Sequence, residues 1–379
     1  MTKKKICFIV SSPMTVKAFL LEHIKLLSTE FDVYLIANFA GYNQHNISPF
    51  LTEIFNVKIV RDITILQDLK AVSHLKKILT QQQFDAIHTV TPKAGLLGMI
   101  AGKLAKTKVR THIFTGQVWY TRKGFMKVLL IVADKLVVAL STNILVDSIA
   151  QRQFLMDHHV LKKEKSKVLG DKGSISGVDF NKFIPDKVVR ERYRKELNYD
   201  PQEIVFLFLG RLNIDKGVLD LAAAFSKLQN EFLNVKLLFI GFDEENLLPR
   251  IKEIVGDKNL KFYGPTDEPE KLMQAGDVLC LPSYREGFGT TVIEGSILRL
   301  PIICSDTYGL KETIIDNKTG LRHRVKDVES IYDQMKKLTT DSVLRTEMGE
   351  AGRQYVLNNF NSSHISEKWL AFYRELLKS

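Results

Sequence analysis

The chain has 379 residues, 45% of them hydrophobic, and a formal net charge of +11. That length exceeds one ordinary domain and predicts two, and the hydrophobic content excludes a disordered protein. The three cysteines stand apart in apolar runs without metal-ligand spacing. This excludes a disulfide framework and a cysteine metal site, and it favours a reducing, cytoplasmic compartment.

The positive charge is confined to the first half of the chain. Residues 1–182 contain 26 Lys and Arg against 13 Asp and Glu, a net charge of +13, whereas the rest contains 28 against 30, a net charge of −2. We therefore expect the first half to meet an anionic partner, such as an anionic membrane surface. The alternative is a set of solvated lysines without a partner.

The first half alternates short apolar runs with helical patterns, which predicts parallel strands covered by helices. The expected strands are Ile6–Ser11, Val33–Ala37, Ala86–Val90, His112–Thr115 and Ile144–Asp147, and the expected helices include Ala18–Leu27 and Leu66–Leu79.

Two strand ends of the first half carry residues suited to an acceptor site. His88 and Lys93 lie where one strand gives way to a helix, and Thr115, Gly116, Gln117 and Trp119 follow the next strand. Amide and indole groups suit hydroxyl recognition and sugar stacking, and His88 could act as a general base. A packed histidine and a core tryptophan are the alternatives.

No membrane-spanning segment is expected. The first apolar run ends at Val10, too early for a signal peptide. Two lysines, an aspartate and an asparagine interrupt the apolar segment Phe125–Val146. The start of this segment could still make shallow contact with a membrane, and a core helix is the alternative. The apolar residues concerned are Phe125, Met126, Leu129 and Leu130, flanked by Arg122, Lys123 and Lys127.

The second half repeats the alternation of strands and helices after a junction near Asp179–Pro185. Its expected elements are the helix Val188–Leu197, the strands Ile204–Leu209, Val235–Gly241, Leu260–Tyr263, Val278–Leu281 and Pro301–Cys304, and an amphipathic helix over Trp369–Leu377. The α/β pattern predicts two Rossmann-like domains, residues 1–182 and 183–360, and a final helix, 361–379. Because ligands bind beyond the carboxyl ends of such strands, the cleft between the domains is the expected site.

Two cations follow the first strand of the second half. Arg211 and Lys216 come after the strand end at Gly210, where they could neutralise a diphosphate, with solvated surface cations as the alternative. Gly241 ends the next strand and could border a nucleotide. Thr266 lies in a loop that could line a base pocket, although a plain turn and a helix cap are the alternatives for these two positions.

Glu286 and Glu294 are the most informative residues. Seven residues separate them, across a glycine-containing turn from an expected strand end into a helix that starts at Thr290. Ionised carboxylates accept hydrogen bonds from hydroxyl groups, and a helix N-terminus attracts an anion. The pattern predicts a site for a sugar joined to a phosphate, with two surface glutamates as the alternative.

These motifs together resemble glycosyltransferase family 4, whose members are retaining, nucleotide-sugar-dependent enzymes of the GT-B fold. The resemblance covers nearly the whole chain and is strongest from Gly210-Arg211 through Asp215-Lys216-Gly217 to Pro282-Ser-Tyr-Arg-Glu286-Gly-Phe-Gly and Glu294. The segments His88–Gly98 and Thr115–Trp119 look like a branch that builds bacterial surface polysaccharides.

The resemblance implies a role for each candidate, with no metal or other cofactor. Arg211 and Lys216 would hold the donor diphosphate, Glu286 the donor sugar and Glu294 the ribose. The residues implied to bind the nucleotide sugar are Glu294, Gly287, Phe288, Gly289, Thr290, Gly241 and Thr266. Many members carry a His-Gly pair where this chain has Thr115-Gly116, so the role of that histidine is unassigned here.

The combined interpretation is a retaining glycosyltransferase. We expect it to move a hexose or N-acetylhexosamine from a nucleoside diphosphate, with UDP expected, to a glycan acceptor such as a polyprenyl-diphosphate-linked one. We expect it to lie in the cytoplasm or on the inner face of the plasma membrane. One alternative is a nucleotide-sugar epimerase on the same fold. The other is a nucleic-acid-binding protein that uses the basic half, although the sequence contains no recognised nucleic-acid module.

Overall fold

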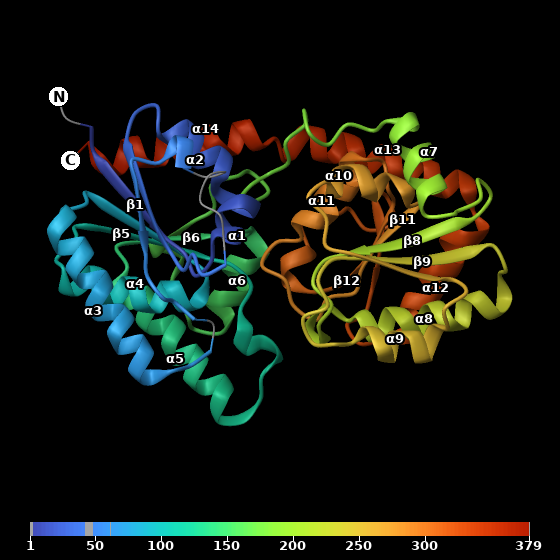
Figure 1. The fold of residues 1–379 in the computed structure, drawn as a ribbon, viewed down its shortest axis with the longest axis horizontal. Helices are drawn as coiled ribbons and strands as arrows, with labels where there is room; N and C mark the ends of the chain where they lie inside the picture. Colours follow the sequence, from blue (N-terminus) through green and yellow to red (C-terminus); the bar gives the residue numbers. More distant parts are fainter. Residues whose placement is uncertain (1–2, 42–47, 61, 379) are drawn as a thin grey trace. The chain divides into compact units, whose positions relative to one another are not determined.

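The computed structural model describes residues 3–41, 48–60 and 62–378 and divides into two compact units (Figure 1). Unit 1 comprises Met1–Gly177 together with Ser362–Ser379, and unit 2 comprises Val178–Asn361. The chain therefore leaves unit 1, builds unit 2 and returns. The division falls between residues 177 and 178, whereas the sequence interpretation places it at 182/183.

Unit 1 is built on a seven-stranded parallel sheet in the order β3-β2-β1-β4-β5-β6-β7. Its strands are β1 Lys5–Ile9, β2 Asp32–Ala37, β3 Glu53–Asn56, β4 Ala86–Val90, β5 Val109–Phe114, β6 Asn143–Val146 and β7 Ser166–Lys167. The five strands expected from the sequence are confirmed. The apolar pattern misses β3, which is only partly buried, and β7, which is two residues long.

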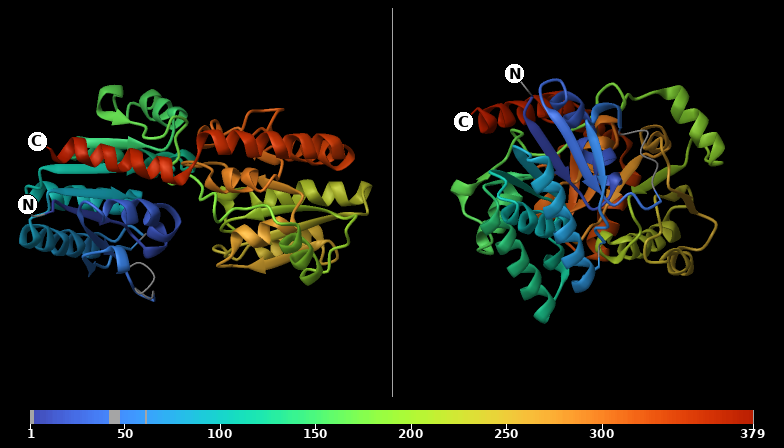
Figure 2. Two further views of the ribbon diagram at one scale, coloured as in Figure 1. Left: turned by 90° about the horizontal axis from the view of Figure 1, so that it is seen from above. Right: turned by 60° about the vertical axis from the view of Figure 1, so that its left-hand side comes forward.

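Helices cover both faces of this sheet (Figure 2). They are α1 Pro13–Thr15, a π-helical turn at Val16–Leu20, α2 Leu21–Leu27, α3 Ile65–Gln82, α4 Pro92–Leu104, α5 Gly124–Leu140, α6 Ile149–Asp157 and α14 Ser362–Leu377. Successive side chains of β1 point to opposite faces. Cys7 and Ile9 therefore pack with residues of α3 and α4, while Ile6 and Phe8 pack with α2 and α14.

Helix α14 completes the core of unit 1. The indole of Trp369 is stacked between two imidazoles, with ring centroids 4.7 Å from His23 and 4.8 Å from His88. The hydroxyl of Tyr373 lies 2.6 Å from Nδ1 of His88. Burial lowers the pKa of His23 to about 4 and lowers that of His88 well below its ordinary value, so both rings stay neutral and pack as aromatic groups.

Unit 2 is built on a six-stranded parallel sheet in the order β10-β9-β8-β11-β12-β13. Its strands are β8 Ile204–Leu209, β9 Val235–Ile240, β10 Leu260–Gly264, β11 Val278–Leu281, β12 Ile302–Ser305 and β13 Gly320–His323. Its helices are α7 Lys187–Glu196, α8 Val218–Glu231, α9 Leu248–Val255, α10 Pro269–Leu272, α11 Thr290–Ile297, α12 Val328–Thr340 and α13 Ser342–Asn359. Two doubly wound, Rossmann-like units are thereby confirmed.

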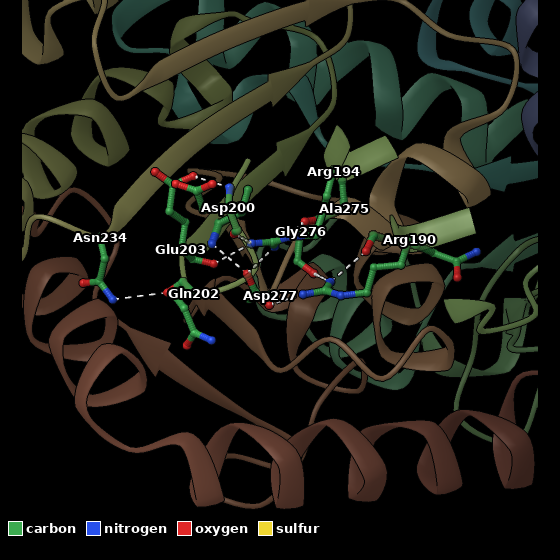
Figure 3. A network of polar contacts seen from close by, with 11 residues as sticks. Arg190, Arg194, Asp200, Gln202, Glu203, Asn234, Ala275, Gly276 and Asp277 are labelled. Carbon is green, nitrogen blue, oxygen red and sulfur yellow. Dashed lines mark hydrogen bonds and ion pairs between the residues drawn. The ribbon is translucent and has the colours of Figure 1, made fainter. Parts of the chain in front are cut away.

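Asp277 fastens the amino ends of β8 and β11 to helix α7 (Figure 3). Its carboxylate accepts hydrogen bonds from Arg190 Nη2 at 2.5 Å, from Arg194 Nη1 at 3.0 Å and from the backbone nitrogen of Val205 at 2.8 Å. This network lies at the edge of the sheet opposite the carboxyl strand ends. It therefore supports the fold of unit 2 and does not line a ligand site at the carboxyl edge.

Candidate functional site

Each sheet has a point where the order of its strands reverses. In unit 2 the chain runs outward from β8 through β9 to β10, then returns to place β11 on the other side of β8. The loops after β8 and β11 therefore diverge at the carboxyl edge of the sheet, which is where doubly wound folds bind nucleotides. Arg211 and Lys216 follow β8, and Glu286 follows β11, so the strongest candidates of the sequence flank this point.

Backbone contacts lock these two loops together. The backbone nitrogen of Tyr284 donates to the carbonyl of Asp215 at 2.8 Å, and Arg285 Nε donates to the Asp215 carboxylate at 2.8 Å. Gly217 has φ +67°, and a Cβ atom there would lie 2.2 Å from the carbonyl oxygen of Pro282. Only glycine combines an unstrained positive φ with the absence of a side chain, which the approach of Pro282 requires. The loop that carries Lys216 is thus held against the loop that carries Glu286.

Lys216 and Glu286 form the centre of the site. Lys216 Nζ donates to Glu286 Oε1 at 2.5 Å, and Ser283 Oγ donates to the same oxygen at 2.7 Å. Within the described residues, the other carboxylate oxygen of Glu286 has no hydrogen-bond partner, so it can accept from a sugar hydroxyl. Ser283, which the sequence interpretation missed, is recognisable only as the second residue after a buried strand.

Arg211 has a carboxylate partner that the sequence interpretation did not assign. Its Nη1 donates to both oxygens of Glu244, at 2.5 and 2.7 Å, and Asn213 Nδ2 donates to Glu244 at 2.7 Å. Glu244 follows β9, the neighbour of β8. The carboxylate holds the guanidinium at the strand ends, where the Arg211 side chain is 42% exposed and open to an anion.

Glu294 lies one turn into α11 and has no hydrogen bond or ion pair with any described residue. Burial raises its pKa from 4.5 to about 7, with Lys182 opposing this shift and Glu270 adding to it. The carboxyl group is therefore partly desolvated, and its oxygens are free to accept hydrogen bonds. Both properties suit a protein carboxylate that binds a ligand.

The start of α11 also offers unused polar groups. The hydroxyl of Thr290, the first residue of the helix, is buried without a hydrogen-bond partner among the described residues. Gly287 and Gly289 are buried beside it, and the ring of Phe288 packs against Phe360 with centroids 5.6 Å apart. Phe288 therefore serves the core with its side chain and could contact a ligand only through its backbone.

Gly241 and Thr266 have structural roles in unit 2. A Cβ atom on Gly241 would lie 2.0 Å from the carbonyl oxygen of Gly210, so a side chain would separate the ends of β8 and β9. Thr266 Oγ1 accepts from the backbone nitrogen of Glu268 at 3.1 Å, just before α10. The turn and the cap weighed from the sequence are both present, and nucleotide contacts at these two residues remain predictions.

Two acceptor-side candidates of unit 1 need correction. His88 is fully buried under α14, where it packs against Trp369, so its surroundings are those of a packed histidine. Trp119 is buried too, and its Nε1 donates to Asp134 Oδ2 at 2.7 Å. Neither ring lies at a surface that a sugar could reach, and both alternatives weighed from the sequence hold.

Lys93 and Gln117 also have intramolecular partners. Lys93 Nζ donates to Asp68 Oδ2 at 2.6 Å and ties α4 to the first turn of α3. The buried side chain of Gln117 donates to the carbonyl of Thr115 at 2.7 Å. Thr115 and Gly116 are partly exposed at the carboxyl end of β5, which keeps them as candidates.

Three residues at the carboxyl edge of unit 1 escaped the sequence interpretation. Ser11 and Thr91 follow β1 and β4, at the reversal of strand order, and their hydroxyl oxygens lie 2.8 Å apart. Thr91 has φ +77°, a strained conformation for a β-branched residue that concentrates at functional sites. Asp147 follows β6, and burial raises its pKa to about 8. Within the described part of the chain its Oδ1 has no partner.

No group of three or more His, Cys, Asp or Glu side chains in residues 3–41, 48–60 and 62–378 is placed to hold a metal ion. Across the same residues, no helix combines the length and apolarity that crossing a bilayer requires.

Comparison with known proteins assigns the enzyme class. Residues 189–355, which include Arg211, Lys216, Glu244, Glu286 and Glu294, match the family of glycosyl transferases group 1. The chain is 28% identical over 358 residues to the capsular polysaccharide biosynthesis glycosyltransferase CapM of Staphylococcus aureus, covering 93% of this chain and 92% of CapM. The chain is a glycosyltransferase. The residues that match the group 1 family lie within unit 2.

Two further likenesses extend over nearly the whole glycosyltransferase. It is 25% identical to the UDP-Gal:alpha-D-GlcNAc-diphosphoundecaprenol alpha-1,3-galactosyltransferase of Escherichia coli, over 90% of this chain and 88% of that one. It matches Anabaena Alr3699/HepE, solved with UDP and glucose, with a TM-score of 0.81 at 16% identity, over 98% of this chain and 99% of that one. The structural likeness establishes the GT-B fold class. These relatives give no support to the epimerase and nucleic-acid-binding alternatives.

Proposed function

We propose that this glycosyltransferase moves a hexose or N-acetylhexosamine, with retention, from a UDP-sugar to a polyprenyl-diphosphate-linked glycan in surface polysaccharide synthesis. The observation that carries the proposal is the juxtaposition of Lys216, Arg211 and Glu286 at the reversal point of the unit 2 sheet. The Escherichia coli relative is named for a UDP-sugar donor and a diphosphoundecaprenol acceptor, and the Anabaena structure contains UDP.

The proposed chemistry relies on positioning and electrostatics. Arg211 and Lys216 would bind the diphosphate and stabilise the charge that develops as it leaves, which replaces a metal ion in that role. Glu286 would hold a sugar hydroxyl, and Glu294 would accept hydrogen bonds from the ribose. The acceptor hydroxyl would attack from the face that the diphosphate leaves, so retention needs no strong enzymatic base.

Carboxylates neutralise both cations of the proposed diphosphate site. Glu286 pairs with Lys216, and Glu244 pairs with Arg211. A bound diphosphate would replace the two carboxylates as the partner of Lys216 and Arg211. The Glu286 carboxylate would then be free to bind the sugar. The proposed acceptor also places the enzyme at the inner face of the plasma membrane as a peripheral protein of the cytoplasm.

A thermal-shift screen of nucleotide sugars tests the donor half of the proposal. A true donor at a hundredfold excess over its dissociation constant stabilises the folded chain by about 2.7 kcal/mol. The donor found in this way then enters turnover assays with the Glu286→Gln variant, in which we expect a large loss of turnover with little change in UDP affinity. The exposed Glu253 supplies the matched control, Glu253→Gln. Stabilisation by no nucleotide sugar, or normal turnover of Glu286→Gln, would contradict the proposal.

A further inference from the structure

Helix α5 presents apolar side chains where a surface helix ordinarily presents polar ones. Five of them follow the helical spacing i, i+3, i+4, i+7 and i+11 and form one continuous line, which we call the α5 stripe. Its members and their exposed fractions are Phe125 79%, Val128 58%, Leu129 39%, Val132 55% and Leu136 41%. Single exposed apolar residues are common on protein surfaces, whereas a contiguous patch marks a site of interaction.

The stripe argues against the alternative weighed from the sequence, in which this segment is a core helix. The buried residues of α5 are Asp134 and Val137, and Leu130 and Ile131 pack partly against the core. Of the four apolar residues singled out in the sequence, Leu130 faces inward and the other three are exposed.

The rotation of α5 about its own axis is fixed by its inner face. Asp134 accepts the hydrogen bond of the buried Trp119 indole, and Val137 lies in the core of unit 1. The stripe points outward because these contacts hold the opposite face.

A second group of exposed apolar side chains lies at the start of α3. Ile65, Leu66 and Leu69 are 72%, 76% and 63% exposed. Helices α3, α4 and α5 follow the parallel strands β3, β4 and β5 and run back along one face of the sheet, so their first residues lie at its carboxyl edge (Figures 1 and 2). The start of the α5 stripe and the α3 group therefore border the same edge of unit 1, which also carries the remaining acceptor-side candidates.

The charges around the stripe identify its partner. Arg122, Lys123, Lys127 and Lys135 flank or interrupt it, and the one acidic residue between 122 and 140 is the buried Asp134. An apolar line with cations beside it and no exposed acid complements an anionic lipid surface. A second copy of this chain fits less well, because it would bring two basic surfaces together.

We propose that the α5 stripe, with the α3 group, lies in the headgroup region of an anionic bilayer and holds the carboxyl edge of the unit 1 sheet at the membrane surface. The inference rests on the proposed function only for the reason why the enzyme would bind a membrane, which is that a polyprenyl-linked acceptor is confined there. The lipid contact itself does not depend on the donor chemistry of unit 2.

A tryptophan placed in the stripe tests the contact directly. The two native tryptophans, Trp119 and Trp369, are buried, so the Phe125→Trp variant of the intact chain adds the one exposed indole. Vesicles of phosphatidylglycerol and phosphatidylcholine with brominated acyl chains should quench and blue-shift its emission, and high salt should reverse both changes. The matched control is Leu233→Trp in unit 2, where the native residue is 87% exposed, and we expect no quenching there.

A second variant measures how much the stripe contributes. Phe125→Gln combined with Leu129→Gln and Val132→Gln removes apolar surface from exposed positions, so the fold of unit 1 should survive, as an unchanged fluorescence of the buried Trp119 and Trp369 would show. We expect vesicle affinity in flotation to fall by roughly tenfold or more, given the apolar area removed. The matched control, Leu233→Gln with Val343→Gln, should bind vesicles like the unchanged chain.

Three results would overturn the inference. One is unaltered vesicle binding of the triple variant. Another is equal binding of the unchanged chain to neutral and anionic vesicles, which would remove the basic flank from the contact. The third is self-association of the unchanged chain that the triple variant abolishes, which would make a second copy the occupant. Vesicle binding without any nucleotide-sugar affinity would contradict the proposed function and leave this inference standing.

Discussion

Glu294→Gln is expected to stabilise the protein and weaken its nucleotide binding at the same time. The folded chain keeps a proton on Glu294 up to a pKa of about 7, whereas the ordinary value is 4.5. Between these values the folded state binds more protons than the unfolded state, so stability falls as pH rises through this window. At 1.36 kcal/mol per pKa unit, the ionised carboxylate costs up to about 3 kcal/mol above pH 7. Partial exposure to solvent reduces that figure.

Calorimetry of the nucleotide-free protein is the suitable assay, because both tryptophans lie in unit 1 and their fluorescence would miss unit 2. We expect the unit 2 transition of Glu294→Gln to be more stable than that of the unchanged chain at pH 8 and nearly equal to it at pH 4.5. The glutamine resembles the protonated acid, so it removes the cost of burying a charge. Glu253→Gln, on the exposed face of α9, should change neither transition.

Affinity for UDP should move in the opposite direction. The amide loses a charged acceptor, which is worth about 1.5–3 kcal/mol per hydrogen bond, so the affinity at pH 8 should fall on the order of 10- to 100-fold. The affinity of the unchanged chain should decline toward that of the variant as pH drops below 7. An unchanged UDP affinity would remove Glu294 from the nucleotide site, and an unchanged stability at both pH values would show that its carboxyl group is not desolvated.

Further predictions concern the cations, the metal and the fold. Lys216→Ala and Arg211→Ala should each lower turnover by roughly 10²–10³ through lost stabilisation of the leaving diphosphate, and near-normal turnover of either variant would remove that residue from the site. Turnover should survive excess EDTA, and a tenfold loss that Mg²⁺ restores would contradict this. Asp277→Ala should destabilise unit 2 by about 3–5 kcal/mol in calorimetry, because it leaves the buried Arg194 without its carboxylate, and a loss no larger than that of Glu253→Gln would be incompatible with this role.

Apolar runs predicted most of both sheets, and their failures have local causes. The strand β13, Gly320–His323, contains one aliphatic residue and gives no apolar run. For helix α5 the sequence left membrane contact and a core helix both open, because hydrophobic content fits either, and only the tertiary contacts of Asp134 and Val137 show which face is covered. Hydrophobicity alone is therefore a more reliable predictor of the presence of a helix than of the surface that the helix contacts.

The candidate site was predictable where it depends on strand ends. Lys216 and Glu286 each follow an apolar run, and neighbouring parallel strands bring their ends together, so their contact follows from the pattern. The ion pair of Arg211 with Glu244 forms because β8 and β9 lie side by side. The sequences of the two loops that carry these residues do not reveal that the strands are neighbours. The burial of His88 depends on α14, almost 300 residues later in the sequence, and no local signal could show it.

The interrupted sequence of unit 1 sets the order in which the chain can fold during synthesis. Residues 1–177 leave the ribosome without Trp369 and Tyr373, so one face of their sheet is covered only in part, by α2 and the turn before it. Unit 2 is contiguous and spans 184 residues, which take roughly 10–40 s to translate. During that interval the earlier half exposes Phe8 and the imidazole of His88 to other nascent chains and to chaperones. Truncation after Asn361 would leave the molecule in that state permanently, with an intact unit 2 attached to a unit 1 that lacks the part of its core that α14 supplies.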